Sequence, residues 1–236
     1  MYVKVLYDAK AKRGLLSGRG FACLIDNKIL FDAGGDPEAL VENMDRLMVS
    51  IPELEAVVIS SDKWDHTGGL WEVLKRKKGL KVYACPVFSE TFKNCVKELG
   101  GELILVEGPT SITENIHVTG AIEARHNETV IHEQALVVNG EKGVSLINGC
   151  SDAGILNVIQ TVKARMDIDK MYMVIGGFRL ESEERDDIAA TIARLESMGV
   201  EKIGPTHSTE DKVNRIFSGK YHGNFIPVMA GHIIQL

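Results

Sequence analysis

Cysteine and glutamine are scarce in this sequence, and the cysteines show no pairing pattern. The cysteines are Cys23, Cys85, Cys95 and Cys150, and no two of them form a CxxC motif. A dense disulfide framework is therefore excluded, and reduced thiols in a cytoplasmic protein are the simplest interpretation. Glutamine occurs only three times beside abundant lysine and glutamate, a balance that favours a heat-adapted source.

Long apolar runs and excess positive charge are also missing. No apolar run approaches the roughly 20 residues that span a bilayer, and the start, MYVKVLYDAK, lacks the apolar core of a signal peptide. The net charge of −6 argues against general binding to nucleic acid or to an anionic membrane. We therefore expect a cytoplasmic protein that binds a small-molecule substrate or ligand.

The composition is that of a folded protein with a substantial core. The chain has 236 residues, of which 44% are hydrophobic and 25% charged, the usual balance of a globular protein. Each half begins with strands and continues with alternating helices and strands. No linker rich in proline, glycine or serine separates the halves. We expect a single α/β domain over residues 1–236, with two packed sheets and helices outside.

Periodicity and turn residues predict the individual elements. Strands are expected at 2–7, 21–25, 28–31, 54–59, 81–84, 116–122, 134–138, 144–147, 171–175 and 202–203, with closing strands up to residue 234. Helices are expected at 37–48, 69–78, 89–99, 153–165, 182–198 and 209–216. Asp26-Asn27 and Asn139-Gly140 are predicted to be the turns of two hairpins.

The segment most informative about chemistry is SSDKWDHTGGL at 60–70, where a buried strand gives way to a helix. Ligands collect at such strand ends in α/β folds. Asp65 and His66 place a carboxylate beside an imidazole. Taken alone, these two residues could also be a hydrogen-bonded pair in a turn.

This segment resembles the signature of the metallo-β-lactamase superfamily, His-x-His-x-Asp-His-x-Gly-Gly, and FDAGG at 31–35 resembles the superfamily's first motif. Further segments resemble one branch, which includes dihydropterin ribofuranosyl-aminobenzene phosphate synthase-like proteins: HEQALVV at 132–138, NGCSDAGILN at 148–157, IGGFRL at 175–180 and PTHSTE at 205–210. The resemblance covers most of the chain. It implies the superfamily's four-layer αββα sandwich and two adjacent metal sites.

The first of these metal sites is altered in this sequence. The three histidines that the resemblance implies are replaced by Ser61, Lys63 and Asp152. A lysine ammonium has no lone pair for a metal, but it can take the place of a cation. Because a buried lysine is tolerated when it is paired, we expect Lys63 and Asp152 to form an ion pair where the first metal would lie.

The residues implied for the second site are present. Asp65, His66 and His207 would be three ligands of an open site, and Asp152 or Cys150 could be a fourth. The implied cofactor is one divalent metal, zinc before iron or manganese, or none. Other interpretations stay open: Asp152 could cap the helix at 153–165, His207 could lie at a helix start, and Cys150 could be a small buried residue.

The resemblance also implies roles around this site. Lys63 would stabilise negative charge on a substrate, and Asp65 would orient the attacking group. Arg179 could bind a substrate phosphate or carboxylate, or form a plain surface ion pair. The residues expected behind the ligands are Asp32, Ser61 and Cys150.

Three functions are compatible with these features. The first is a hydrolase-like enzyme with at most one metal, acting on a small ester, phosphate or pterin-type substrate. The second is a non-catalytic, metal-free protein that binds a small anionic or pterin-like ligand. The third, a scaffold for a partner protein, is less favoured because no long exposed apolar stripe is evident.

Overall fold

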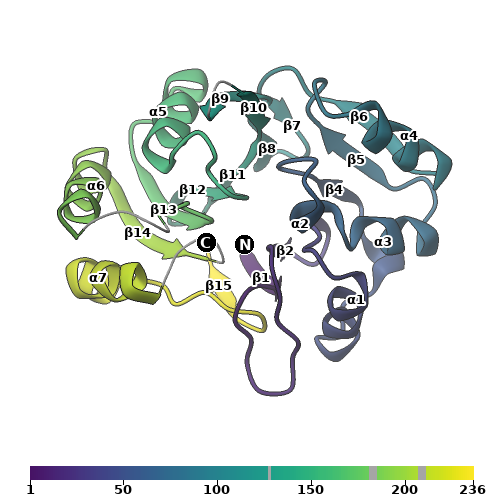
Figure 1. The fold of residues 1–236 in the computed structure, drawn as a ribbon, viewed down its shortest axis with the longest axis horizontal. Coiled ribbons are helices and arrows are strands. Elements are labelled where there is room, and N and C mark those ends of the chain that lie inside the picture. Colours follow the sequence, from purple (N-terminus) through teal and green to yellow (C-terminus); the bar gives the residue numbers. More distant parts are fainter. Residues whose placement is uncertain (127–128, 181–184, 207–210) are drawn as a thin grey trace.

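A computed structural model describes residues 1–126, 129–180, 185–206 and 211–236. The described strands form two large sheets and a separate hairpin, and helices cover the outer side of each large sheet (Figure 1). The α1, α3 and α4 helices lie on one side of the molecule and α5, α6 and α7 on the other, with the strands between them. The predicted αββα sandwich is thus confirmed.

The first sheet contains the N-terminal strands and the last strand of the chain. Its strands, in spatial order, are β15 (Ile233–Gln235), β1 (Tyr2–Tyr7), β2 (Ala22–Ile25), β3 (Ile29–Phe31), β4 (Ala56–Val58), β5 (Lys81–Ala84) and β6 (Glu102–Leu105). Strands β3 to β6 are parallel, whereas β15, β1, β2 and β3 are antiparallel neighbours. The turn between β2 and β3 includes the predicted Asp26-Asn27 and also Lys28, because Ile25 pairs with Ile29. Asp26 and Asn27 both have positive φ, which aspartate and asparagine tolerate in turns.

The second sheet is built mainly from the C-terminal half. Its strands, in spatial order, are β14 (Val200–Pro205), β13 (Met171–Gly176), β12 (Gly143–Asn148), β11 (Ala135–Gly140), β8 (Ile116–Val118) and β7 (Thr110–Ser111). Strands β12, β13 and β14 are parallel. A hairpin of β9 (Ile122–His126) and β10 (Thr129–Glu133) was not predicted.

Two of the helices begin at a residue whose side chain caps the first turn. They are α1 (Pro37–Arg46), α2 (Trp64–Thr67), α3 (Leu70–Arg76), α4 (Glu90–Glu98), α5 (Ile155–Met166), α6 (Arg185–Ser197) and α7 (Asp211–Tyr221), and 3₁₀ turns occur at Ile51–Glu53 and His222–Asn224. The Asp36 side chain accepts hydrogen bonds from the first turn of α1, and Ser89 caps α4 in the same way. Within the described residues, no helix has the length and apolar character needed to cross a membrane.

Three apolar layers hold the sandwich together, and alternation along the strands separates them. In β2, Ala22 and Leu24 pack toward α1, α3 and α4, whereas Cys23 and Ile25 pack between the sheets. In β11, Val137 packs toward the C-terminal helices and its neighbours pack between the sheets. Because successive strand residues point to opposite faces, a central strand covered on both sides must be apolar throughout.

Two local predictions were wrong, and one short helix was not predicted. The turn between β11 and β12 is Glu141-Lys142, because Gly140 pairs with Gly143 and the buried partners set the register. The helix expected at 69–78 is present as α3, and the short α2 helix before it was not predicted. The α5 helix begins at Ile155 after Gly154, so Asp152 does not cap it.

Candidate active site

The described residues of the predicted site lie at one edge of the sandwich, where strands of both sheets end. Asp32 follows β3, Ser60 follows β4, and the 149–152 loop follows β12. An added Cβ at Gly149 would lie only 2.0 Å from Ser60 Oγ and 2.9 Å from Asp32 Oδ2. The Gly149 backbone of one sheet therefore lies directly against the Ser60 and Asp32 side chains of the other. Only a residue without a side chain permits this close approach.

Asp32 organises the buried part of the site. Its Oδ1 accepts the Ser60 backbone N–H at 2.7 Å, and its Oδ2 accepts the Ser60 hydroxyl at 2.7 Å and His66 Nδ1 at 2.8 Å. All three residues are at most 1% exposed. Asp32 has φ of 53°, a conformation that aspartate tolerates better than most residues. It therefore orients His66, and its role behind a metal ligand stays a prediction.

His66 carries a strongly perturbed imidazole. Burial alone lowers the pKa of this group, but the Asp32 carboxylate, hydrogen bonds to Asp32 and Cys150, and the charge of Asp65 outweigh burial and raise the pKa of His66 to about 10. Cys150, predicted behind the ligands or as a fourth ligand, thus contacts His66.

Lys63, Asp152 and Arg179 form an ion-pair network. Lys63 Nζ pairs with Asp152 Oδ2, so the predicted ion pair is present, and Arg179 Nη1 pairs with Asp152 Oδ1. The Asp152 side chain is completely buried, whereas the Lys63 and Arg179 side chains are 37% and 35% exposed. The sequence analysis predicted only Lys63 as the partner of Asp152, whereas in the structure Lys63 and Arg179 share the Asp152 carboxylate.

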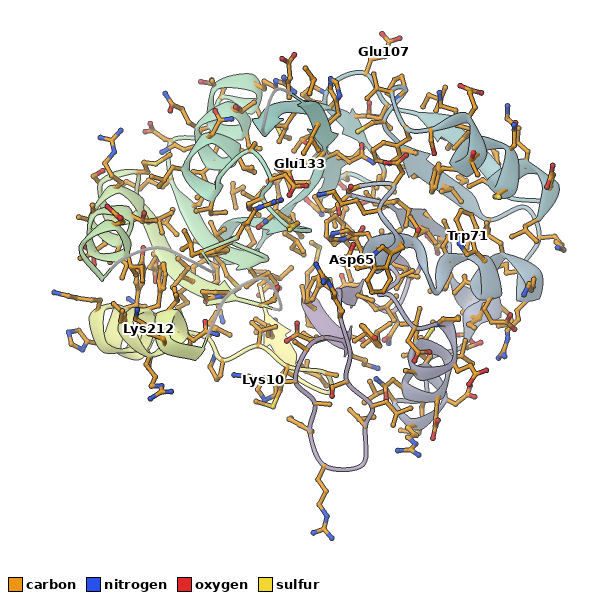
Figure 2. The ribbon with its side chains drawn as sticks, viewed as in Figure 1. Lys10, Asp65, Trp71, Glu107, Glu133 and Lys212 are labelled. Atoms are coloured by element: carbon orange, nitrogen blue, oxygen red, sulfur yellow. The ribbon has the colours of Figure 1, made fainter. Side chains whose placement is uncertain are left out.

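Glu133, at the end of β10, is a site residue that the sequence analysis did not single out. Its carboxylate accepts the backbone N–H groups of Asp152 at 3.2 Å and Ala153 at 3.0 Å. Burial raises the pKa of Glu133, while the N–H of Ala153 and the charges of His66 and Lys63 act in the opposite direction. Figure 2 shows Glu133 and Asp65 in the middle of the molecule, between the two helical layers. In the sequence, the signal that could have pointed to Glu133 is a charged residue just before the apolar run ALVV at 135–138.

Asp65 lies between buried and exposed groups. Its Oδ1 is 4.0 Å from His66 Nε2, and its Oδ2 is 3.5 Å from Nε of the exposed Arg19. Arg19 also lies over the Trp64 ring, 5.8 Å from its centroid. The carboxylate is thus held between an imidazole inside and a guanidinium outside.

Of the two remaining predicted residues, the structure describes Ser61 but not His207. Ser61 is 3% exposed and follows Ser60 at the end of β4. His207, and with it the interpretation of His207 as a helix start, lies outside the described residues.

Among the described residues, the donors implied for a two-metal centre are incomplete. Lys63 and Asp152, which stand where the resemblance implies two histidines of the first site, form an ion pair, and the described part of the chain contains no group of three His, Cys, Asp or Glu side chains arranged for a metal. Asp65 and His66 do provide a carboxylate and an imidazole side by side, a donor pair that zinc accepts. The third donor predicted with them is His207.

The contact between the sheets at Gly149 gives a first prediction. Gly149→Ala is expected to lower the free energy of unfolding by about 1–3 kcal/mol, the usual effect of forcing a group into a packed site, because the added Cβ meets Ser60 Oγ and Asp32 Oδ2. The matched control is Gly219→Ala in α7, where an added Cβ meets nothing within 4 Å; it is expected to gain roughly 0.5–1 kcal/mol. Urea unfolding measures both, and equal stability of the Gly149 variant and the parent would contradict this packing.

Comparison with known proteins identifies relatives in sequence and in structure. No protein-family model matches the chain. It is 27% identical over 250 residues to the 7,8-dihydropterin-6-methyl-4-(β-D-ribofuranosyl)-aminobenzene-5′-phosphate synthase of Methanocaldococcus jannaschii, covering 89% of this chain and 85% of the synthase. An uncharacterised protein of the same organism is 28% identical, over 75% of this chain and 79% of its own length.

The structural comparison decides the classification. The crystal structure of Tm1679, a metal-dependent hydrolase of the β-lactamase superfamily, superposes with a TM-score of 0.83 and 25% identity, over 100% of this chain and 99% of that chain. The chain belongs to the metallo-β-lactamase superfamily. A second member of this superfamily fold, YhfI from Bacillus subtilis, has a TM-score of 0.72 at 14% identity, over 99% of both chains. In this chain, Lys63 and Asp152, which stand where the resemblance implies histidines, form an ion pair.

Proposed function

We propose that this superfamily member is a hydrolase-like enzyme with an atypical site, which binds a small anionic substrate, a phosphate or ester of pterin type, and uses at most one divalent metal. The observation that carries the proposal is the network in which Lys63 and Arg179 share the buried Asp152 carboxylate. Taken by itself, this network has two cations against one carboxylate.

The two cations are suited to an anionic substrate. Each side chain is about one-third exposed, so the network reaches the surface of the protein. The lysine ammonium has three N–H donors and the guanidinium five. Because Asp152 holds both side chains in place, little conformational entropy remains to be lost when an anion binds.

The other residues have positioning roles in this proposal. Asp65, between His66 and Arg19, orients the attacking group. Lys63 stabilises negative charge that develops on the substrate. Glu133 holds the 152–153 backbone that presents Asp152 to its cations.

The substrate class is supported by the sequence relative. Its name describes a phosphate that also carries a dihydropterin, and the cations of this chain suit the phosphate end of such a compound. Zinc, and after it iron or manganese, is proposed as the single metal, held by Asp65, His66 and His207. A bound divalent metal would supply Lewis-acid polarisation of the scissile group.

Metal analysis of the purified protein tests the metal part of this proposal. We expect at most about one equivalent of zinc, iron or manganese, which disappears in His66→Ala, because only one implied site retains its donors. The matched variant, Ser61→His with Lys63→His and Asp152→His, is expected to bind one more equivalent than the parent. A triple variant that binds no more metal than the parent would contradict the assignment of these positions.

A metal-free protein that binds a small anionic or pterin-like ligand is the second candidate. The observation that favours it is the Lys63 ammonium, which already neutralises Asp152 without a metal. If the parent holds no metal even after incubation with zinc, iron and manganese salts, this candidate replaces the enzyme. If the parent holds two equivalents, both candidates are wrong.

A further inference from the structure

An exposed tryptophan lies within the segment that carries the site. Trp64 is the first residue of α2, and it stands between Lys63 of the ion-pair network and Asp65. Its side chain is 60% exposed, and among the described residues it is the only aromatic one of the exposed large apolar side chains. Because tryptophan is on average highly buried in folded proteins, an exposed indole at this position calls for an explanation.

The indole of Trp64 is held in place by the backbone beneath it. An added Cβ at Gly35 would lie 2.5 Å from Cζ3 and 3.0 Å from Cε3 of the indole, so the six-membered ring packs against the Gly35 backbone. That backbone is fixed in turn, because the Gly35 N–H donates to the Arg19 carbonyl at 3.1 Å. A ring that is already fixed loses little conformational entropy when a ligand covers it.

The indole also lies beside the charged groups that the proposed function uses. The Arg19 guanidinium lies over the Trp64 ring, 5.8 Å from its centroid, and the same guanidinium is 3.5 Å from Asp65 Oδ2. In the other direction along the chain, Lys63 pairs with Asp152. The Lys63 ammonium and the indole are at most about 15 Å apart, the reach of two long side chains on neighbouring Cα atoms.

A fixed and exposed indole suits one class of ligand. Flat heteroaromatic rings stack on aromatic side chains, because each ring has a π face of large area. A saturated ring of the same size has no such face and gains less from the contact. The pterin-type substrate of the proposed function has a flat ring and an anionic end, and the two ends have different chemical requirements.

We infer that Trp64 stacks the flat ring of the substrate while Lys63 and Arg179 hold the anionic end. The inference rests on the proposed function, because it takes the anionic end to bind at the ion-pair network. It adds a contact that determines specificity, made by a residue that belongs neither to the network nor to the implied metal donors.

Titration with free pterin, which has the ring but no phosphate, tests the role of Trp64. We expect Trp64→Leu to weaken pterin binding about 10- to 100-fold, because leucine is apolar but offers no flat face for stacking. Trp64→Phe keeps a flat face and is expected to weaken binding less than about fivefold. Calorimetry measures both affinities, and circular dichroism checks that both variants are folded.

Tryptophan fluorescence reports directly on contact between pterin and the indole. Trp64 and Trp71 are the two tryptophans of the chain. Trp71 packs against Phe92 with ring centroids 5.7 Å apart, and Figure 2 shows it apart from Asp65. In Trp71→Phe, which leaves Trp64 as the emitter, pterin is expected to bind as in the parent and to quench the emission strongly.

The matched control for quenching is Trp64→Phe, in which Trp71 is the emitter. At the same pterin concentration its emission is expected to fall far less, and it corrects for light absorbed by free pterin. If the parent does not bind pterin, or if Trp64→Leu binds it like the parent, the inference is wrong. Equal losses of affinity in Trp64→Leu and Trp64→Phe would also overturn it, because the contact would then not be stacking.

Inorganic phosphate separates this inference from the proposed function. Phosphate binding that is weakened at least about tenfold by Arg179→Met, the expected loss of a charge-assisted contact, supports the anion site alone. If phosphate binds in this way and pterin binding does not depend on Trp64, the stacking inference fails and the proposed function stands. If pterin quenches Trp64 but phosphate does not bind, the proposed anion site fails.

Discussion

Removal of both cations that flank Asp152, in the variant Lys63→Met with Arg179→Met, is expected to lower the free energy of unfolding by about 3–5 kcal/mol. This is the usual effect of leaving a buried charge without its partners. The Asp152 side chain is completely buried, and each of its oxygens is paired with one of the two cations. Each single substitution should have a smaller effect, because the other cation remains and both cations are partly exposed.

The control for this prediction is Asp152→Asn in the background of the double variant. It removes the uncompensated charge, and we expect it to recover most of the lost stability. Urea unfolding of the parent, the single variants, the double variant and the triple variant gives the complete series. If Asp152→Asn destabilises the double variant further, the loss of unfolding free energy does not arise from an unpaired Asp152 charge. The ion-pair network would then not be what stabilises Asp152.

Asp32→Ala is expected to have an effect of similar size, about 3–5 kcal/mol, because it leaves a buried imidazole without its charge partner. Asp32 accepts hydrogen bonds from the backbone and the hydroxyl of Ser60 and from His66. Each of these donors is buried, and a buried donor without an acceptor costs about 1–3 kcal/mol.

Ser60→Ala is the matched control for Asp32. It removes one hydroxyl donor but leaves the hydrogen bond between Asp32 and His66, so a loss of only about 1 kcal/mol is expected. Thermal and urea unfolding compare the two variants. Equal losses in both would show that Asp32 contributes one ordinary hydrogen bond rather than the charge that holds His66.

Much of the secondary structure could be predicted because its signals are local. The hairpin at Asp26-Asn27, the α1 helix beginning at Pro37 and the strand Lys81–Ala84 all follow from neighbouring residues. The Asn139-Gly140 turn was misplaced because the register of β11 and β12 depends on their buried partners. The β9–β10 hairpin was missed entirely.

The site could be predicted only where a motif pointed to it. The resemblance placed Lys63 beside Asp152, and the structure contains that ion pair. The same reasoning did not anticipate that Arg179 would pair with Asp152 or that Glu133 would hold the adjacent backbone. Neither partner is close to Asp152 in sequence, and no spacing rule connects them.

By itself, the sequence determined the alternation of strands and helices, and it has Ser61, Lys63 and Asp152 where the resemblance implies three histidines. Only the tertiary structure decided that Arg179 also pairs with Asp152 and that Glu133 holds the adjacent backbone. Lys63 and Asp152 are 89 residues apart, and they come together because strands from two sheets end at one edge. At that edge, burial makes an unpaired charge so costly that each buried carboxylate must have a partner supplied by another part of the chain.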